Sequence, residues 1–277
     1  MRFSIVTPSF RQSQWLKLCI ESVADQGVDV EHLVQDAGSD DGTADWLRAE
    51  RRVNPQVGRD AGIFDALNRG FQRSRGEVLG QLNCDEQFLP GTLAAVAEFF
   101  RAEPNIEMVF ADVVVVDPGG HYLWHRKIIR PLLFHTWVCT VGTLTCALFF
   151  RRSVLESRRL QFDVRWKYCG DAEWLLRALQ QGVRIAVLRR FASVYTVTGT
   201  NLSWTKGAEE ESRALFATAP RPVAWLKPLL IWHHRLRRVL GGAYFQRPFQ
   251  YSLYTLDSPR QRVLRKAARP TGRWRQP

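Results

Sequence analysis

The first fifty residues alternate apolar runs with amphipathic segments, and this order restricts the fold more than any other feature. Residues 3–7 and 30–35 have the composition of buried strands, while residues 14–24 and 43–52 have helical spacing. Alternation of strands and helices implies a mostly parallel sheet with right-handed crossovers and helices on its faces. We therefore expect an α/β fold.

The alternation continues to about residue 190. We expect helices at 60–74, 90–101, 152–157 and 170–181, an apolar run at 144–150, and strands at 77–82, 108–116 and 183–188. The turn at 117–120 should join the strand at 108–116 to a hairpin partner at 122–129. Ligands of open α/β sheets bind beyond the carboxyl ends of the strands. The loops at those ends are therefore the first places to search for a site.

Small polar and acidic residues follow the first three predicted strands. They are Thr7, Pro8 and Ser9; the loop 36–43, with Asp36 and Ser39; and Asn83, Asp85 and Glu86. Two carboxylates after a buried strand suit Mg²⁺ or Mn²⁺, although acids before a helix are also common for structural reasons. An acid such as Asp36 can accept hydrogen bonds from a sugar hydroxyl or a base NH. The alternative for loop 36–43 is an ordinary Asx-rich turn.

Two predicted helices also carry polar residues that could have a function. The first holds Asp60, Asp65 and Asn68, and the last two lie on one helical face. An amphipathic helix with a polar face explains this segment equally well. Asp171, at the start of the helix 170–181, suits either a general base or a helix cap. We find no glycine-rich phosphate loop, so a diphosphate would be held by a metal and by basic side chains.

Cysteines and histidines give no sign of a metal or disulfide framework. The five cysteines are odd in number, widely spaced and without a C-x-x-C pair, which indicates a reducing, cytoplasmic compartment. His121 and His125 fall in the predicted hairpin, and we interpret them as surface residues. No apolar run approaches the ~18–20 residues of a membrane-spanning helix.

The positive charge of the chain is confined to its C-terminal part. The chain has 39 Lys and Arg against 27 Asp and Glu, but residues 221–277 hold 13 of the basic residues and one acid. We therefore divide the chain into a neutral domain at 1–220 and a basic tail at 221–277. A neutral body argues against a nucleic-acid partner. Residues 222–240 of the tail combine Trp, Leu and Arg, which suits either a helix on anionic lipid or a helix docked on the domain.

Taken in order, the motifs resemble those of the family-2 glycosyltransferases of the GT-A fold, especially bacterial enzymes that build polysaccharides. The matching segments are Thr7 to Phe10, Val34 to Thr43, Asp60 to Gly70, Gly76 to Glu86 and Asp171 to Arg177. The resemblance covers roughly residues 1–200. It implies a GT-A, Rossmann-like sheet flanked by helices, followed here by a basic helical tail.

The resemblance also implies an activity: inverting transfer of a sugar from a UDP- or GDP-linked donor to a glycan or lipid-linked acceptor. Asp36 then matches the acid that contacts the nucleoside, Asp85 and Glu86 the metal site for Mg²⁺ or Mn²⁺, and Asp171 the catalytic base. The expected donor pocket comprises Thr7, Pro8, Ser9, Asp36, Ser39, Asp60, Asp65, Asn68, Asn83 and Asp85.

Three positions depart from the family pattern: Asn83 and Glu86 stand where Asp is frequent, and Gly170 stands where Glu usually precedes the base. The Gln-x-x-Arg-Trp signature of processive synthases is absent, which favours a single addition. A lipid-linked acceptor would place the protein on the inner face of the cytoplasmic membrane, with its tail on the lipid. The alternatives are an inactive scaffold that only binds a nucleotide or glycan, and a nucleic-acid-binding protein that uses the tail.

Overall fold

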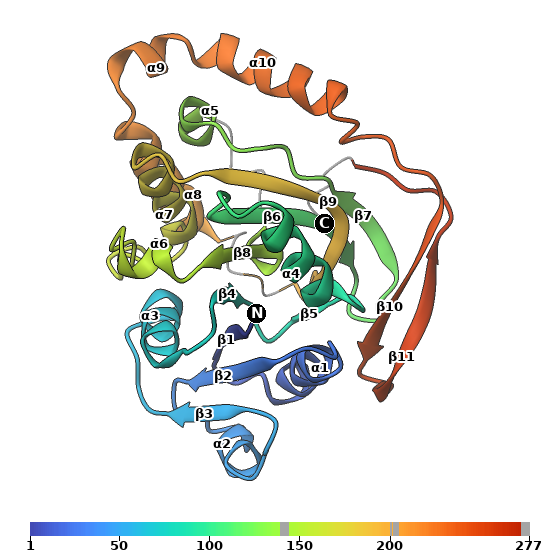
Figure 1. The fold of residues 1–277 in the computed structure, drawn as a ribbon. Coiled ribbons are helices and arrows are strands. Elements are labelled where there is room, and N and C mark those ends of the chain that lie inside the picture. Colours follow the sequence, from blue (N-terminus) through green and yellow to red (C-terminus); the bar gives the residue numbers. More distant parts are fainter. Residues whose placement is uncertain (139–143, 200, 202–204, 273–277) are drawn as a thin grey trace.

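The structure is a computed structural model that describes residues 1–138, 144–199, 201 and 205–272. A curled sheet with the strand order β3-β2-β1-β4-β8-β6-β9-β5 forms its centre, and β7 pairs with β6 beside this path. Helices cover both faces of the sheet (Figure 1). The predicted α/β fold is confirmed.

The N-terminal half contains the parallel part of the sheet. Its elements are β1 (Phe3–Ser9), α1 (Ser13–Ala24), β2 (Val30–Asp36), α2 (Thr43–Leu47), β3 (Asn54–Val57), α3 (Ile63–Arg73) and β4 (Val78–Gln81). β1 pairs in parallel with β2 and β4, and β2 with β3. Phe3 and Ile5 of β1 pack in the cluster that includes residues of α1, while Val6 packs with α3. Because β1, β2, β3 and β4 are parallel, their carboxyl ends lie at one edge of the sheet. The helices α1 and α3 pack on either side of β1.

The approach of α3 to the sheet depends on Gly70. A Cβ atom at this position would lie 2.3 Å from Cγ1 of Val6. A separation this short is a steric overlap, so any side chain at position 70 would push α3 away from β1. Gly70 thus fixes the distance between the helix and the strand whose end reaches the site.

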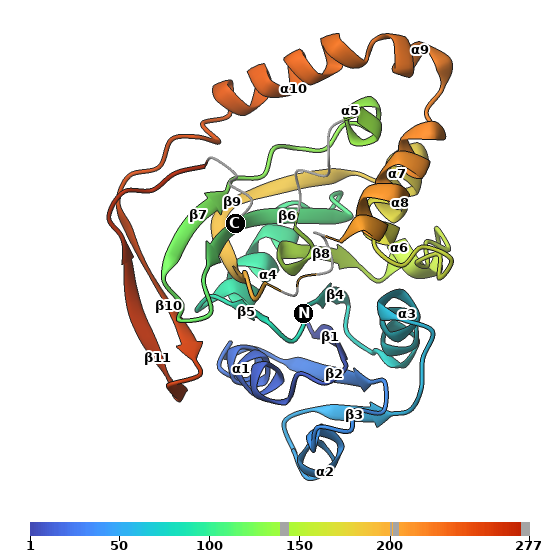
Figure 2. The same cartoon turned by 180° about the vertical axis from the view of Figure 1, so that it is seen from behind.

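The second half makes the sheet mixed rather than mostly parallel. Its elements are β5 (Glu86–Phe88), α4 (Thr92–Ala102), β6 (Met108–Val116), β7 (Tyr122–Arg126), α5 (Leu133–Val138), the 3₁₀ turn η1 (Thr145–Ala147), β8 (Leu148–Arg151), α6 (Ser153–Glu156), α7 (Gly170–Gln180), β9 (Ile185–Thr196) and α8 (Lys206–Ala217). β6 and β9 are parallel, but β8 runs antiparallel to both β4 and β6. β8 therefore joins the two parallel parts of the sheet (Figure 2).

Three segments differ from the sequence-based expectation. The helix expected at 43–52 ends at Leu47, and the next segment forms the edge strand β3, whose sequence Asn-Pro-Gln-Val has no apolar run to reveal it. Glu86 begins a short strand rather than continuing a loop. His125 is buried at 1% exposure, so its interpretation as a surface residue was wrong; its Nδ1 lies 2.8 Å from the Tyr122 hydroxyl.

The chain after residue 220 forms the helices α9 (Arg221–Trp225) and α10 (Lys227–Leu240), followed by an antiparallel hairpin of β10 (Phe249–Thr255) and β11 (Ser258–Ala267). The sequence predicted the helical part but not the hairpin. Tyr251 and Leu253 of β10 pack against Leu89, Val114 and Val194 of the body. The hairpin is therefore part of the folded body, despite its basic composition.

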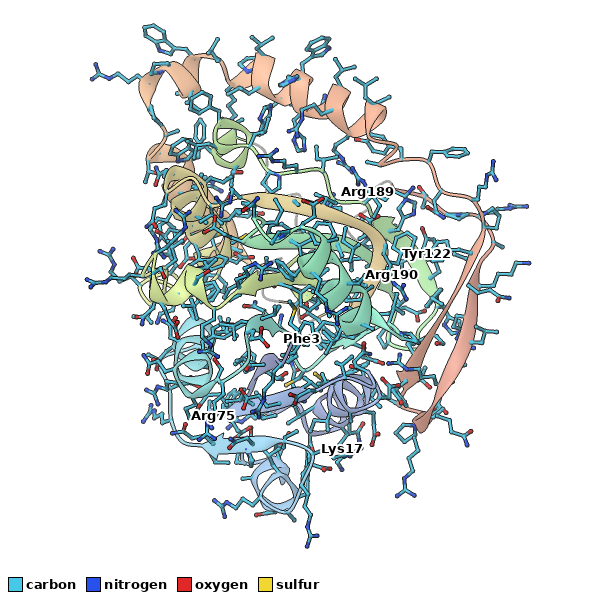
Figure 3. All side chains as sticks on the ribbon, viewed as in Figure 1. Phe3, Lys17, Arg75, Tyr122, Arg189 and Arg190 are labelled. Atoms are coloured by element: carbon cyan, nitrogen blue, oxygen red, sulfur yellow. The ribbon has the colours of Figure 1, made fainter. Side chains whose placement is uncertain are left out.

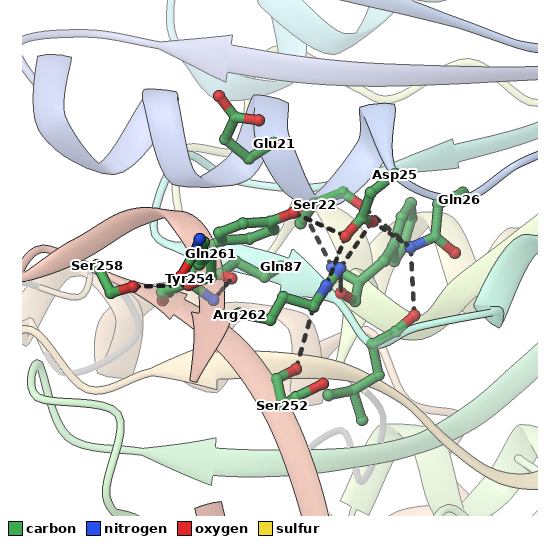
Figure 4. A network of polar contacts seen from close by, with 12 residues as sticks. Glu21, Ser22, Asp25, Gln26, Gln87, Ser252, Tyr254, Ser258, Gln261 and Arg262 are labelled. Carbon is green, nitrogen blue, oxygen red and sulfur yellow. Dashed lines mark hydrogen bonds and ion pairs between the residues drawn. The ribbon is translucent and has the colours of Figure 1, made fainter. Parts of the chain in front are cut away.

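A polar network fastens this hairpin to α1 (Figure 4). Arg262 of β11 donates two hydrogen bonds to the carboxylate of Asp25, at 2.5 and 2.8 Å, and the Tyr254 hydroxyl donates a third at 2.8 Å. Tyr254 and Gln87 are joined by two further bonds between side chain and main chain. The bonds link residues more than 160 positions apart, so they close the body around its C-terminal hairpin.

Among the described residues, no helix is long and apolar enough to cross a membrane. The described cysteines Cys19, Cys84, Cys146 and Cys169 are free thiols. Cys139 lies outside the described residues.

Candidate active site

Asp36, at the end of β2, organises the loop that follows it. Its Oδ1 accepts hydrogen bonds from the backbone NH groups of Gly38 and Ser39, at 3.0 and 2.8 Å. Its Oδ2 accepts bonds from the hydroxyls of Ser39 and Ser9, at 2.7 and 2.9 Å. These four donors satisfy a carboxylate with 0% exposure. Asp36 thus ties the loop to the end of β1, and its contact with a nucleoside stays a prediction.

The three predicted residues at the end of β1 differ in their exposure. Thr7 is fully buried and its hydroxyl lies 2.8 Å from Nε2 of His32, on the side of the sheet that faces α1. Successive side chains of a strand alternate between its faces, so the Thr7 hydroxyl is directed into the core rather than to the sheet edge. Pro8 is partly exposed, and Ser9 is held by Asp36. Pro8 is thus the most exposed of the three, and contact of any of them with a donor stays a prediction.

Asp60 and Asp65 form an acidic group before and within the first turn of α3. Asp60 accepts a hydrogen bond from the Gly62 NH, and Asp65 accepts one from the Ala61 NH and pairs with Arg69 at 2.8 Å. Burial raises the pKa of Asp60, and the nearby charges of Asp65 and Asp36 raise it further. Because the charges of Asp65 and Asp36 both act on the pKa of Asp60, the three carboxylates lie near one another. Their combined negative charge would attract a cation.

Asn68 lies on the same helix but is engaged elsewhere. Its amide NH₂ donates to the Phe162 carbonyl at 2.8 Å, and its Oδ1 accepts from the Phe162 NH at 3.0 Å. These bonds join α3 to the segment that precedes α7. The structure thus gives Asn68 a role in holding two parts of the site together, while a contact with the donor stays a prediction.

The segment after β4 brings Asn83, Asp85 and Glu86 to the same sheet edge. The backbone NH of Asn83 donates to Oε2 of Glu86 at 2.7 Å, and Glu86 is only 2% exposed. Burial raises the pKa of both Glu86 and Asp85, and the charge of Asp85 raises that of Glu86 further. Asp85 is the more exposed of the two carboxylates. Oδ1 of Asn83, two residues before Asp85 in the chain, is buried and makes no hydrogen bond to the described residues.

Asn201 also reaches this segment, and the sequence did not single it out. Its Nδ2 donates to Oδ2 of Asp85 at 3.1 Å and to the carbonyl of Thr196 at 3.0 Å. Asn201 lies in the loop after β9, where no recognisable motif marks it. Its neighbours at 200 and 202–204 lie outside the described residues.

Asp171 lies in the first turn of α7, beside an apolar cavity. The residues lining this cavity with Asp171 are Phe110, Thr145, Leu148, Phe162, Trp174 and Leu175. Burial raises the pKa of Asp171, which the hydrogen bond from the Ala172 NH at 2.8 Å offsets in part. Among the described residues no cation is paired with Asp171. A carboxylate of raised pKa without an ion-pair partner suits a group that accepts a proton.

Gly170 allows α7 to begin where it does. A Cβ at this position would lie 2.6 Å from Cε2 of Phe64, whose ring stacks on Phe162 at 5.4 Å between centroids. The departure of Gly170 from the family pattern therefore has a packing cause. The next turn of the helix carries the expected pair of Glu173 and Arg177, bonded at 2.6 and 2.8 Å.

The 3₁₀ turn η1 connects the Asp171 side of the site to the Asp85 side. Thr145 lines the cavity with Asp171, and η1 also contacts β5, which begins at Glu86. The two acidic groups are thus separated by one short turn. The sequence could not reveal this link, because η1 lies in an apolar run without a recognisable motif.

The donor atoms at the end of β4 fit a hard divalent cation. Asp85 and Asn83 provide carboxylate and carboxamide oxygens, and Mg²⁺ and Mn²⁺ prefer oxygen ligands. Among the described residues no group of three or more His, Cys, Asp or Glu side chains could hold a metal ion. The protein would then provide only part of the coordination sphere, and the phosphate oxygens of a ligand would provide the rest.

Comparison with known proteins gives a match to a family model. The model for glycosyl transferase family 2 matches residues 4–158. Among curated proteins, a PGL/p-HBAD biosynthesis glycosyltransferase of Mycobacterium bovis is 27% identical over 186 residues, which cover 63% of this chain and 68% of that protein. The residues that the family model matches, 4–158, extend from β1 to α6 and include Asp36 and Asp85.

Solved structures share the fold at low sequence identity. S. aureus TarS has a TM-score of 0.62 at 16% identity, and the match covers 91% of this chain and 58% of TarS. TarS 1-349 in complex with UDP-GlcNAc has a TM-score of 0.64 at 18% identity, covering 87% and 73%. The mannosyltransferase PcManGT from Pyrobaculum calidifontis, in complex with GDP-Man and Mn²⁺, has a TM-score of 0.58 at 18% identity, covering 86% and 69%. The mixed, curled sheet is thus that of the GT-A glycosyltransferases.

Proposed function

Because the chain belongs to glycosyl transferase family 2, we propose that it transfers one sugar from a nucleoside-diphosphate sugar to an acceptor hydroxyl, with inversion at the anomeric carbon. The acceptor is a glycan or a lipid-linked glycan of a cell-surface polysaccharide. The observation that carries this proposal is the carboxylate of Asp171, which borders an apolar cavity; the cavity is also lined by Thr145 of η1, and this turn contacts the strand that begins at Glu86.

The donor binds at the edge formed by β1, β2 and β4. The nucleoside lies against the loop that Asp36 organises, and the diphosphate lies toward Asp85. The donors in the TarS and PcManGT complexes carry UDP and GDP, which supports a nucleotide of one of these two kinds. Asp60 and Asp65 border the same edge, and Arg69 offsets part of their charge.

A divalent cation, Mg²⁺ or Mn²⁺, accompanies the donor. Asp85 would hold it together with the Asn83 carboxamide, and Glu86 supports the segment from the buried side through the Asn83 NH. When bound, the cation neutralises charge on the departing diphosphate. Asn201 orients the Asp85 carboxylate by its hydrogen bond to Oδ2.

Asp171 acts as the general base. The acceptor oxygen attacks the anomeric carbon as its proton passes to Asp171, and the bond from that carbon to the diphosphate oxygen breaks. One displacement of this kind inverts the anomeric centre and needs no protein nucleophile. The apolar cavity keeps the pKa of Asp171 above its ordinary value, so the carboxylate is a stronger base than an exposed Asp.

The reaction takes place in the cytoplasm, at the inner face of the cytoplasmic membrane. The free thiols of the described cysteines suit a reducing compartment. A lipid-linked acceptor would require that the protein reach the bilayer surface.

A donor screen followed by an activity assay tests the proposal. The purified protein is heated with a panel of UDP- and GDP-sugars, with and without Mn²⁺, and we expect one donor to raise the melting temperature most when Mn²⁺ is present. Release of nucleoside diphosphate is then measured with that donor and candidate acceptors. Stabilisation without release under any acceptor would favour an inactive binding scaffold, and no stabilisation by any sugar nucleotide would contradict the donor class.

A further inference from the structure

The outer side of α9 and α10 exposes a continuous apolar row. Its members are Trp225, Leu229, Trp232, Leu236, Val239 and Leu240, and we call them the apolar row. Trp225 is 84% exposed, Trp232 61% and Leu240 78%. Steps of three and four residues from Trp225 to Val239, followed by the adjacent Leu240, place these side chains on one helical face. Figure 3 shows side chains of α10 extending away from the rest of the molecule.

The inner side of α10 is more polar than the outer side. His234 and Arg237 are partly buried there, beside Leu230 and Ile231, and no residue of the helix is fully buried. Arg237 donates to the Arg130 carbonyl at 2.8 Å, and Nδ1 of His233 lies 3.0 Å from Nε2 of His135 on α5. A helix that only covers a protein core has the reverse arrangement, with its apolar stripe inward. Docking on the body therefore leaves the apolar row uncovered.

The charge around the apolar row selects the kind of surface that could cover it. Residues 221–245 contain five Lys and Arg and no Asp or Glu. Arg221 and Arg235 are exposed beside the row. Tryptophan and leucine flanked by arginine are typical of helices that lie in the headgroup region of an anionic bilayer. With 14 residues, α10 is only about 21 Å long, too short to cross the hydrocarbon core.

The same helices are joined through α5 to the element that carries the candidate base. Val223 of α9 and Leu230 of α10 belong to one apolar cluster with Trp137 of α5 and Ala172 and Leu176 of α7. Ala172 follows Asp171 directly. The surface that bears the apolar row is thus fixed to the first turn of α7 by packed side chains, and both lie on the same part of the molecule (Figure 1).

We propose that the apolar row is a bilayer-docking surface: α9 and α10 lie parallel to an anionic membrane, with Trp225 and Trp232 in the headgroup region and Arg235 among the phosphates. The cluster around Trp137 then fixes the orientation of α7 relative to the bilayer. The docking surface itself is independent of catalysis. Only its consequence, presentation of a lipid-linked acceptor to Asp171, rests on the proposed function.

Vesicle sedimentation of the full chain tests the docking surface. The probes are vesicles of phosphatidylcholine alone and of equal parts phosphatidylcholine and phosphatidylglycerol. We expect the protein to pellet with the mixed vesicles, less with phosphatidylcholine alone, and at least ~10-fold less after the double substitution Trp225→Ser and Trp232→Ser. Arg235→Gln should weaken binding to the mixed vesicles only. The matched control is Leu264→Ser, which removes a residue of 62% exposure from β11 and should leave binding unchanged.

Three outcomes would overturn the proposal: no pelleting of the unsubstituted protein, equal pelleting of the double variant, or a dimer in solution that the double variant abolishes. The last would assign the apolar row to a second copy of the chain. Melting temperature and stabilisation by the donor should be the same in all variants, since every substituted side chain is exposed. Vesicle binding without any sugar transfer would disprove the proposed function and leave the docking surface intact.

Discussion

Asp36 and Asp171 are both acids of the proposed site, yet their surroundings differ. Asp36 accepts four hydrogen bonds and is fully buried. Asp171 accepts one from the adjacent backbone NH, and its carboxylate remains partly exposed beside an apolar cavity. A carboxylate whose acceptor sites are filled by hydrogen bonds is held in one position, whereas burial with few hydrogen bonds raises the pKa of a carboxylate, as it does for Asp171.

The difference separates binding from chemistry. The surroundings of Asp36 preorganise a loop, so its removal should affect how the donor is held. The surroundings of Asp171 favour proton uptake, so its removal should affect turnover. The four predictions below test this division, in order of decreasing expected effect.

Asp171→Asn should lower kcat by at least ~100-fold, because an amide of the same shape cannot accept the acceptor's proton. Donor binding should be unchanged, which stabilisation by the donor would report. The matched control is Glu173→Gln on the same helix, whose partner is Arg177 rather than the cavity, and which should keep most of the turnover. Undiminished kcat in Asp171→Asn would remove Asp171 from the role of base.

Asp36→Asn should act mainly on the donor. Oδ2 of Asp36 accepts hydrogen bonds from the hydroxyls of Ser9 and Ser39, and the amide nitrogen of an asparagine could not accept them. The loss should lower the free energy of unfolding by about 1–3 kcal/mol. The loop loses its fixed shape, so the donor KM should rise by about tenfold, equivalent to ~1.4 kcal/mol. Asp41→Asn changes another acid of the same loop, which bonds only to Thr43 and Ser13, and should raise the KM less. A larger loss of kcat than in Asp171→Asn would invert the comparison.

Gly170→Ala should disturb the first turn of α7 by contact rather than by chemistry. The new methyl group would meet the Phe64 ring at 2.6 Å, and overpacking of this kind costs about 1–3 kcal/mol in the free energy of unfolding. The shift should move Asp171 and lower kcat several-fold. Gly58→Ala is the matched control: its Cβ would meet nothing within 4 Å, so its melting temperature should not fall. A melting temperature unchanged by Gly170→Ala would show that the Phe64 ring can move aside without loss of stability.

Much of the fold could be predicted because each strand and helix has its own local pattern. The fully buried β6 and the amphipathic α4 are examples, with β-branched residues and helical spacing respectively. β3 and the hairpin of β10 and β11 could not be predicted, because their stability comes from distant partners. The hairpin depends on Leu89, Val114 and Asp25, which no local pattern connects to it.

The candidate site shows the same limit. Strand order was sufficient to predict that Asp36 and Asp85, after β2 and β4, lie at one edge of the sheet. Asp60 follows the unpredicted strand β3 and entered the expected pocket only through the family resemblance. The sequence could not predict which of these side chains bond to other parts of the protein rather than face a ligand. The hydrogen bond between Thr7 and His32 and the two between Asn68 and Phe162 depend on three-dimensional packing. Asn201 was missed as a partner of Asp85 for the same reason.

The smallest expected effect is a pH dependence of stability. The folded state raises the pKa of Asp171 above its unfolded value, so ionised Asp171 destabilises the fold; this cost is absent below the unfolded pKa and complete above the raised one. Asp171→Asn should therefore melt at the same temperature as the parent protein at low pH, and at a higher one as the pH rises through that window.

Asp163 offers the opposite sign within the same protein. The hydrogen bond from Arg165 lowers the pKa of Asp163, so its ionised form stabilises the fold above the unfolded pKa, and that stability is lost as the pH falls through the lowered value. Asp163→Asn should then melt below the parent protein near neutral pH, by a small margin because Arg165 is 87% exposed. Melting curves of both variants across pH 3 to 8, roughly the range in which carboxyl groups titrate, should diverge in opposite directions. Curves that shift in the same direction would mean that the apolar cavity does not penalise the charge of Asp171, and the contrast with Asp36 would lose its electrostatic basis.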